Sequence, residues 1–178
     1  GRTVKASANH PLLTLGGWKR LDELDVGARI AVPRVIPDPV DPESWPDEHV
    51  VLLAHLLGDG CFASGQPLRY TSGDPANIDA VEKAAVCFGV GGRRVPRASY
   101  IDLYLSADRG LARGRRNPIA EWLDRFGLYG LRSHEKFVPA EIFALPNDQV
   151  ALFLNHLWAT DGSVRWDVKA GQGRVYYA

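Results

Sequence analysis

Two stretches of the chain share one plan, and this repeat constrains the fold more than any other feature of the sequence. Residues 52–60 read Leu-Leu-Ala-His-Leu-Leu-Gly-Asp-Gly, and residues 154–162 read Leu-Asn-His-Leu-Trp-Ala-Thr-Asp-Gly. Each stretch is an apolar helical run that ends in an aspartate followed by a glycine. The repeat therefore predicts two similar helices, whose aspartates are Asp59 and Asp161.

An aspartate at the end of a helix needs a positive partner. The last carbonyls of a helix carry partial negative charge, so a carboxylate is disfavoured there. If the two helices pack side by side, Asp59 and Asp161 converge and repel each other, and a divalent cation or a proton is required for them to coexist. Paired carboxylates of this kind build hydrolytic metal sites. The alternative for either motif alone is a buried amphipathic helix with a glycine stop.

The paired motif resembles the LAGLIDADG homing endonucleases, whose two motif helices form a pseudo-twofold interface. The resemblance implies an α+β fold, with one αββαββα half at residues 44–146 and the start of a second half at 147–178. It implies that Asp59 and Asp161 bind Mg²⁺ with the backbone carbonyls of Gly58 and Thr160. When the motifs are aligned on their aspartates, His156 falls where the first helix has a small alanine.

A second motif lies between the two helices. The run His-Glu-Lys-Phe-Val-Pro at residues 134–139 resembles the Lys-x-Ile/Val-Pro element of intein endonucleases. The resemblance gives Lys136 a catalytic role near the metals, where a lysine can act as a point charge on a phosphate. The alternative is a surface lysine that precedes a helix.

The first 36 residues are expected to be β-rich. Strands are predicted at 3–6, 12–15 and 29–32, with a Gly-Gly turn at 16–17. Ser7, Asn9 and His10 resemble the splicing block of an intein (Hint) domain, in particular of inteins in bacterial replicative DNA helicases. The resemblance makes His10 the residue that assists the N-terminal acyl shift, a task that suits an imidazole. The alternative is a histidine that caps a turn before Pro11.

A proline-rich linker at 37–43 separates this region from the rest. Beyond it, helices are predicted at 47–57, 77–88, 118–126 and 148–159, with Asn147 as a cap of the last. Strands are predicted at 67–71, 93–96, 100–105, 163–168 and 174–177, and one further strand is expected near 61–66.

Composition fits globular domains, because 46% of the 178 residues are hydrophobic and 24% are charged. The net charge is zero, yet residues 61–136 hold twelve basic and eight acidic side chains. We expect Arg69, Arg93, Arg94 and Arg97 to contact DNA from one strand face. Arg109, Arg113, Arg115 and Arg116 extend this basic region. A solvated arginine-rich loop is the alternative.

The sequence has no apolar run of membrane-spanning length and no signal peptide. Cys61 and Cys87 lack metal-ligand spacing and are expected to be buried thiols in a reducing cytoplasm.

Taken together, the motifs predict an intein-encoded homing endonuclease: a site-specific DNA endonuclease that cuts both strands of a long DNA site with Mg²⁺, within a protein-splicing element. Its partners would be double-stranded DNA and the flanking host protein (exteins). The parent would be a monomer with internal pseudo-twofold symmetry, and this chain an internal piece of it. Two rivals remain: a LAGLIDADG module that grips DNA without cleaving it, and an insert in an intein whose only activity is splicing.

Overall fold

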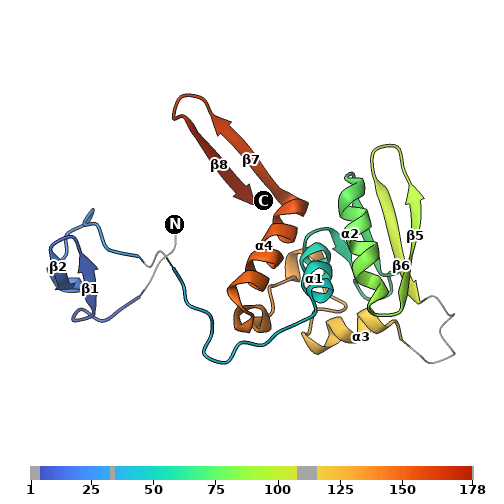
Figure 1. Cartoon of the computed structure of the whole chain (residues 1–178), viewed down its shortest axis with the longest axis horizontal. Helices are drawn as coiled ribbons and strands as arrows, with labels where there is room; N and C mark the ends of the chain where they lie inside the picture. Colours follow the sequence, from blue (N-terminus) through green and yellow to red (C-terminus); the bar gives the residue numbers. More distant parts are fainter. Residues whose placement is uncertain (1–4, 33–34, 108–115, 178) are drawn as a thin grey trace. The chain divides into compact units, whose positions relative to one another are not determined.

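The computed structural model describes residues 5–32, 35–107 and 116–177 (Figure 1). The chain forms two compact units, Gly1–Pro37 and Asp38–Ala178. The predicted strand at 3–6 lies partly outside the described residues, as do Arg109, Arg113 and Arg115.

The first unit is a small β-structure. β1 (Pro11–Thr14) and β2 (Gly17–Arg20) form an antiparallel hairpin, and Gly17 has a positive φ of 100° at its turn. A short 3₁₀ turn follows at Leu21–Glu23. Two predictions are corrected here. Residues 17–20 are a strand, whereas Arg29–Val32 makes only an isolated bridge between Ile30 and Thr14. Residues 17–20 lack the apolar alternation by which a strand is recognised in sequence.

The second unit begins with the element order helix, two strands, helix, two strands, helix. The elements are α1 (Asp47–Asp59), β3 (Gly60–Cys61), β4 (Arg69–Ser72), α2 (Pro75–Val86), β5 (Val90–Pro96), β6 (Ile101–Ala107) and α3 (Pro118–Arg125). The four strands form one antiparallel sheet in the order β3-β4-β6-β5. The protein is therefore an α+β structure, as predicted. β3 overlaps the range 61–66, where one further strand was expected, only at Cys61.

The remainder of this unit returns to a long helix. Two 3₁₀ segments, Ser133–Glu135 and Ala140–Ala144, lead to α4 (Asn147–Asp161). A hairpin of β7 (Gly162–Asp167) and β8 (Gln172–Tyr177) follows. Both long helices continue two residues beyond their predicted ends, so that Asp59 and Asp161 are their last residues.

The core lies between the helices and one face of the four-stranded sheet. α2 packs on β4, β5 and β6, and α1 packs on α2 and on α4 (Figure 1). Most of α1 from Val50 to Leu56 is buried, and it meets Tyr70 and Leu103 of the sheet in the same core. Burying large apolar side chains contributes about 1.5–3 kcal/mol each, so this cluster fixes the positions of both long helices.

Helix starts show how the sequence sets these elements. Asp74 caps α2 through the Ala76 N–H, and Asn117 caps α3 through the Ile119 N–H. The α4 start differs from the prediction, because Asn147 is its first helical residue and the Asn147 N–H donates to the Asp38 carboxylate.

The cysteines also differ from expectation. Cys61 is half-buried and Cys87 is exposed, and both are free thiols. Among the described residues, no helix combines the length and the apolar character that crossing a membrane requires.

Candidate functional site

The ends of α1 and α4 are in close contact. A Cβ added at Gly58 would lie 2.1 Å from the Thr160 hydroxyl oxygen and 2.5 Å from its Cβ. Only glycine fits at this point of the α1 surface, which allows the two helices to approach each other. The contact brings Asp59 and Asp161, the next residues along the two helices, to the same end of the helix pair.

The two carboxylates influence each other. Partial burial raises the pKa of Asp59, and the charge of Asp161 raises it further, while Lys136 acts in the opposite direction. A pair of acids with this mutual repulsion favours a bound cation. The predicted convergence of the acids is thus present in the structure.

Lys136 ends α1. Its ammonium group donates to the carbonyls of Leu56 at 3.0 Å, Leu57 at 3.2 Å, Gly58 at 3.3 Å and Gly60 at 2.6 Å. It also lies 4.8 Å from the centroid of the Phe62 ring. The last carbonyls of a helix have no partner within the helix. Lys136 supplies that partner and offsets the negative end of the helix.

This geometry bears on the predicted metal ligands. Of the two carbonyls predicted as ligands, that of Gly58 accepts from Lys136 at 3.3 Å. Within the described ranges, no cluster of three or more His, Cys, Asp or Glu side chains is placed to hold a metal ion. The two carboxylates, Asp59 and Asp161, are the anionic donors at this end of the helix pair. Such a set fits Mg²⁺, which keeps several waters and is often held by one or two carboxylates.

A histidine pair joins the middle of the same two helices. Nε2 of His55 lies 3.0 Å from Nδ1 of His156, and Nδ1 of His55 lies 3.0 Å from the Tyr70 hydroxyl. Burial, followed by the proximity of His156, lowers the pKa of His55 to about 4. His156 therefore meets His55 across the helix interface, and its size is accommodated by this polar contact.

The second feature is the sheet face opposite α2. Leu103 and Leu105 of β6 point into the core, so Asp102 and Tyr104 point to the other side. Register places Arg69 and Arg93 beside Tyr104, and Thr71 beside Asp102. Arg97, the residue after β5, contacts Asp102 on this side as well. We call this set the open face; its members are Arg69, Thr71, Arg93, Arg97, Asp102 and Tyr104.

Tyr104 lies between two arginines on the open face. The Arg93 guanidinium is 4.7 Å from the ring centroid, and the Arg69 guanidinium is 6.0 Å from it. Guanidinium groups over an aromatic ring are attracted to its negative face. The result is a cationic and aromatic surface on a rigid sheet.

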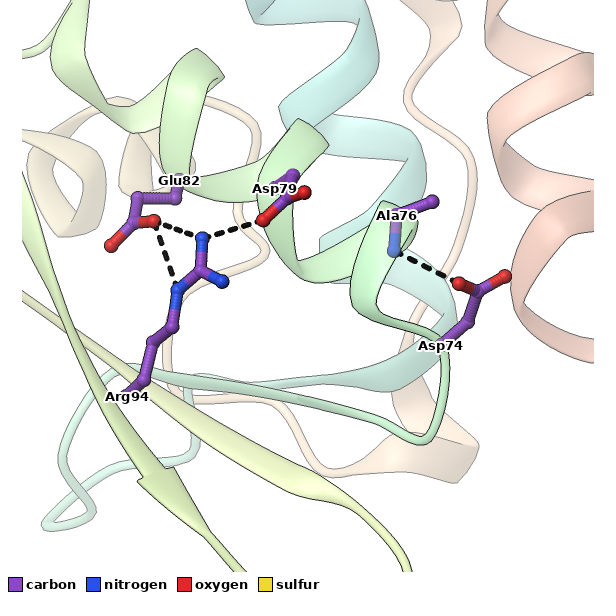
Figure 2. A network of polar contacts seen from close by, with 5 residues as sticks. All are labelled: Asp74, Ala76, Asp79, Glu82 and Arg94. Carbon is purple, nitrogen blue, oxygen red and sulfur yellow. Dashed lines mark hydrogen bonds and ion pairs between the residues drawn. The ribbon is translucent and has the colours of Figure 1, made fainter.

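Arg94 lies on the other side of the sheet. It forms ion pairs with Asp79 and Glu82 of α2 (Figure 2). Arg93 and Arg94 are adjacent residues of one strand and therefore face opposite ways. Of the four predicted DNA contacts, the structure brings Arg69, Arg93 and Arg97 together and places Arg94 against a helix.

The N-terminal candidates lie in the first unit. The His10 N–H donates to the Ser7 carbonyl at 3.0 Å, and the His10 carbonyl accepts from the Leu21 N–H at 2.9 Å. Ser7, Asn9 and His10 are all exposed. These contacts describe a surface turn.

The interpretation from sequence missed several residues of these sites. Tyr104 and Asp102 stood in a recognised alternating strand, but nothing in the sequence told which face α2 would cover. The role of His55 was missed as well, because its partner His156 comes from a helix 101 positions further along the chain.

Comparisons with known proteins give relatives named as a replicative DNA helicase and as protein RecA. The chain is 42% identical to the replicative DNA helicase DnaB of Nostoc sp. over 93% of its length, and 42% identical to that of Rhodothermus marinus over all of it. It is 31% identical to protein RecA of Mycobacterium tuberculosis over 99% of its length. It covers 19%, 19% and 22% of these relatives, respectively. No family model matches the chain.

The chain is thus homologous to a segment that makes up about a fifth of these helicases. This finding contradicts the predicted function. The relatives are named as a replicative DNA helicase and as protein RecA, and their names mention neither an intein nor a homing endonuclease. The prediction of an intein-encoded endonuclease, including the splicing element, is wrong by this comparison.

Proposed function

We propose that this chain is a DNA-binding module of proteins that process DNA, and that the open face of its sheet contacts double-stranded DNA. The observation that carries the proposal is the array of Arg69 and Arg93 around Tyr104. Arginines neutralise phosphates, and strands can place side chains in a groove of the duplex. The sheet holds these groups in fixed register, as a binding surface requires.

The relatives support a shared, DNA-directed role. The same segment aligns with proteins that carry two different names, a replicative helicase and protein RecA. A role common to both is more general than either activity. The sequence contains no Gly-x-x-x-x-Gly-Lys-Ser/Thr run, the phosphate-binding loop of many nucleotide-driven motors. A phosphate-binding loop of this type therefore has no part in the role that we propose for the segment.

We further propose that Asp59 and Asp161 together bind Mg²⁺ at the end of the helix pair. Burial raises the pKa of Asp59 most, and the charge of Asp161 raises it further; this repulsion between the two acids supports the assignment. A Mg²⁺ ion held by two carboxylates keeps coordination positions that water or a DNA phosphate can take. The ion would thus remove the repulsion between the acids and add an anchor for the backbone of DNA.

DNA binding is tested by a matched pair of substitutions. Arg93→Gln and Arg94→Gln remove the same charge from neighbouring positions on opposite sides of the sheet. We expect Arg93→Gln to weaken duplex binding severalfold and to lower the slope of log affinity against log salt by about one, since one phosphate contact contributes about 0.9 to that slope. Arg94→Gln should leave both nearly unchanged. Equal effects of the two substitutions would refute the assignment of the face.

The Mg²⁺ site is tested by thermal unfolding without DNA. Mg²⁺ should raise the melting temperature of the wild type, because an ion that binds only the folded state stabilises it. Asp161→Asn should abolish this response while leaving the metal-free protein at least as stable, because the repulsion is gone. Glu121→Gln, which alters an exposed acid of α3, serves as the control and should retain the full response. An unchanged response in Asp161→Asn would exclude the site.

A further inference from the structure

We propose that Asp102 is a positioning residue for DNA binding: it holds the guanidinium groups of Arg97 and Arg69 in place on the open face. This inference rests on the proposed function. It means that Asp102, although negatively charged, favours the binding of DNA, which is an anion, to the open face.

The contacts of Asp102 come from two residues of β4 and from Arg97, the residue after β5. One carboxylate oxygen accepts from the Thr71 hydroxyl at 2.8 Å and lies 3.6 Å from Nε of Arg69. The other accepts from Nε of Arg97 at 2.9 Å. A single carboxylate thus links β4, β6 and the residue that follows β5.

Asp102 is covered, whereas its arginine partners reach solvent. The Asp102 side chain is 5% exposed, compared with 36% for Arg69 and 45% for Arg97. Its carboxylate is therefore shielded from an approaching phosphate. Arg97 contacts Asp102 through its Nε atom, so its two terminal nitrogens are not the atoms that bind the carboxylate.

The charge on Asp102 is maintained in this position. Burial by itself raises the pKa of a carboxyl group, but the hydrogen bonds from Thr71 and Arg97 and the charge of Arg69 outweigh burial and keep the pKa of Asp102 below its usual range. A partly buried ion pair of good geometry is ordered more firmly than an exposed one.

Ordering an arginine before binding has a direct effect on affinity. A free arginine side chain loses rotamer freedom when it contacts a ligand, at an estimated cost of about 0.5–1.5 kcal/mol. In this proposal Asp102 restricts Arg97 through the hydrogen bond and Arg69 through the weaker ion pair at 3.6 Å, before DNA binds. It also sets the direction in which the planar guanidinium presents its donors.

The Arg94 network provides an internal comparison. Glu82 and Asp79 hold Arg94 on the α2 side of the same sheet (Figure 2). Glu82→Gln therefore removes one negative charge and weakens the ion pair with Arg94, whereas Asp102→Asn removes one negative charge and weakens the ion pairs with Arg69 and Arg97 on the opposite face.

The experiment measures duplex binding by Asp102→Asn and Glu82→Gln across a salt series. A purely electrostatic account predicts tighter binding by Asp102→Asn, because a negative charge has been removed. The positioning account predicts the opposite sign: affinity at least about fivefold weaker, with a salt slope lower by about one phosphate contact. Glu82→Gln should change affinity by less than twofold. Unchanged or tighter binding by Asp102→Asn overturns the inference.

Two further measurements separate this inference from folding and from the proposed function. In Arg97→Gln, which alters a largely exposed side chain, the further effect of Asp102→Asn should shrink, because the two residues act together. Full additivity contradicts the inference.

The second measurement is side-chain ¹⁵N relaxation of the protein without DNA. It should show Arg97 Nε ordered in the wild type and mobile in Asp102→Asn, and equal order in both proteins overturns the positioning role. If the wild type binds no duplex, the proposed function fails, and the DNA role of Asp102 fails with it.

Discussion

Lys136 shows at the level of one residue how a motif can carry a different role from the expected one. The sequence motif suggested a charge beside a reacting phosphate. In the structure its ammonium group donates to four carbonyls around the end of α1. Burial lowers the pKa of Lys136, while neighbouring charges, including Asp59, raise it. Its first task is therefore to complete the end of the helix that carries Asp59.

Replacing this lysine tests the role. Lys136→Met keeps the aliphatic stem but leaves partly buried carbonyls without a donor, which costs about 1–3 kcal/mol. We expect the free energy of unfolding in urea to fall by that amount. Lys83→Met, on the exposed side of α2, should change it by less than about 0.5 kcal/mol. Equal stability of Lys136→Met and the wild type would refute the cap.

His55 makes stability depend on pH. Its pKa in the folded state is about 4, below the ordinary value of 6.5, because burial and the nearby His156 disfavour its charged form. The other ring nitrogen of His55 contacts the Tyr70 hydroxyl. Between pH 6.5 and 4 the unfolded chain binds a proton that the folded protein does not. The contribution is therefore complete above pH 6.5 and is lost as the pH falls, by as much as about 3 kcal/mol.

The measurement is unfolding in urea at pH 7 and at pH 4.5. The loss of stability between the two should be larger in the wild type than in His55→Asn. Asp59, with its raised pKa, acts with the opposite sign in both proteins, so the difference reports the histidine. His134→Asn, an exposed histidine, should behave as the wild type. A wild-type loss no larger than that of His55→Asn would disprove this account.

At the scale of elements, the crossing of α1 and α4 depends on Gly58. Alanine favours a helix by about 1 kcal/mol over glycine, so Gly58→Ala would stabilise an isolated helix. Here the new methyl group would collide with Thr160, including its Cβ, which cannot move away by rotating the side chain. We expect a net loss of about 1–3 kcal/mol from overpacking. Combination with Thr160→Gly should recover part of it, measured by urea unfolding. A Gly58→Ala protein more stable than the wild type would show that the helices are not in contact there.

The elements themselves were largely predictable. The α-helices α1 to α4 follow apolar periodicity and end at recognisable signals, such as Gly127 after α3. The sequence also predicted correctly that the two aspartates at the helix ends lie at the same end of the helix pair. The sequence could not predict contacts between residues that are far apart along the chain. Lys136 caps a helix 76 to 80 positions away, and Gln149 bonds to the backbone of Trp45 at the start of the first helix.

The sequence also could not show which side of the sheet each set of side chains faces. Alternation in β5 and β6 separates two sets of side chains, but it does not tell which set α2 covers. Arg93 and Arg94 were therefore given one role although the structure divides them. The predicted function failed for a related reason: short motifs matched a family pattern. The comparison over the whole chain did give replicative DNA helicases, which the sequence analysis had named, but it gave no endonuclease.

At the scale of the molecule, a net charge of zero hides an uneven distribution of charge. In the second unit, acids pair with Arg94 on the α2 side, while Arg69, Arg93 and Arg97 gather with one covered acid on the other. Affinity for DNA should therefore depend on a local face and fall steeply with salt, even though the whole chain is neutral.

The most direct test is a titration of the ¹⁵N-labelled protein with duplex DNA at low salt, followed by NMR. The account predicts that the largest chemical shift changes occur at Arg93, Thr71 and Tyr104, and that α2 around Asp79 changes little. Changes confined to other regions, such as the β7–β8 hairpin, or no change at any DNA concentration, would contradict the proposal that the open face binds DNA.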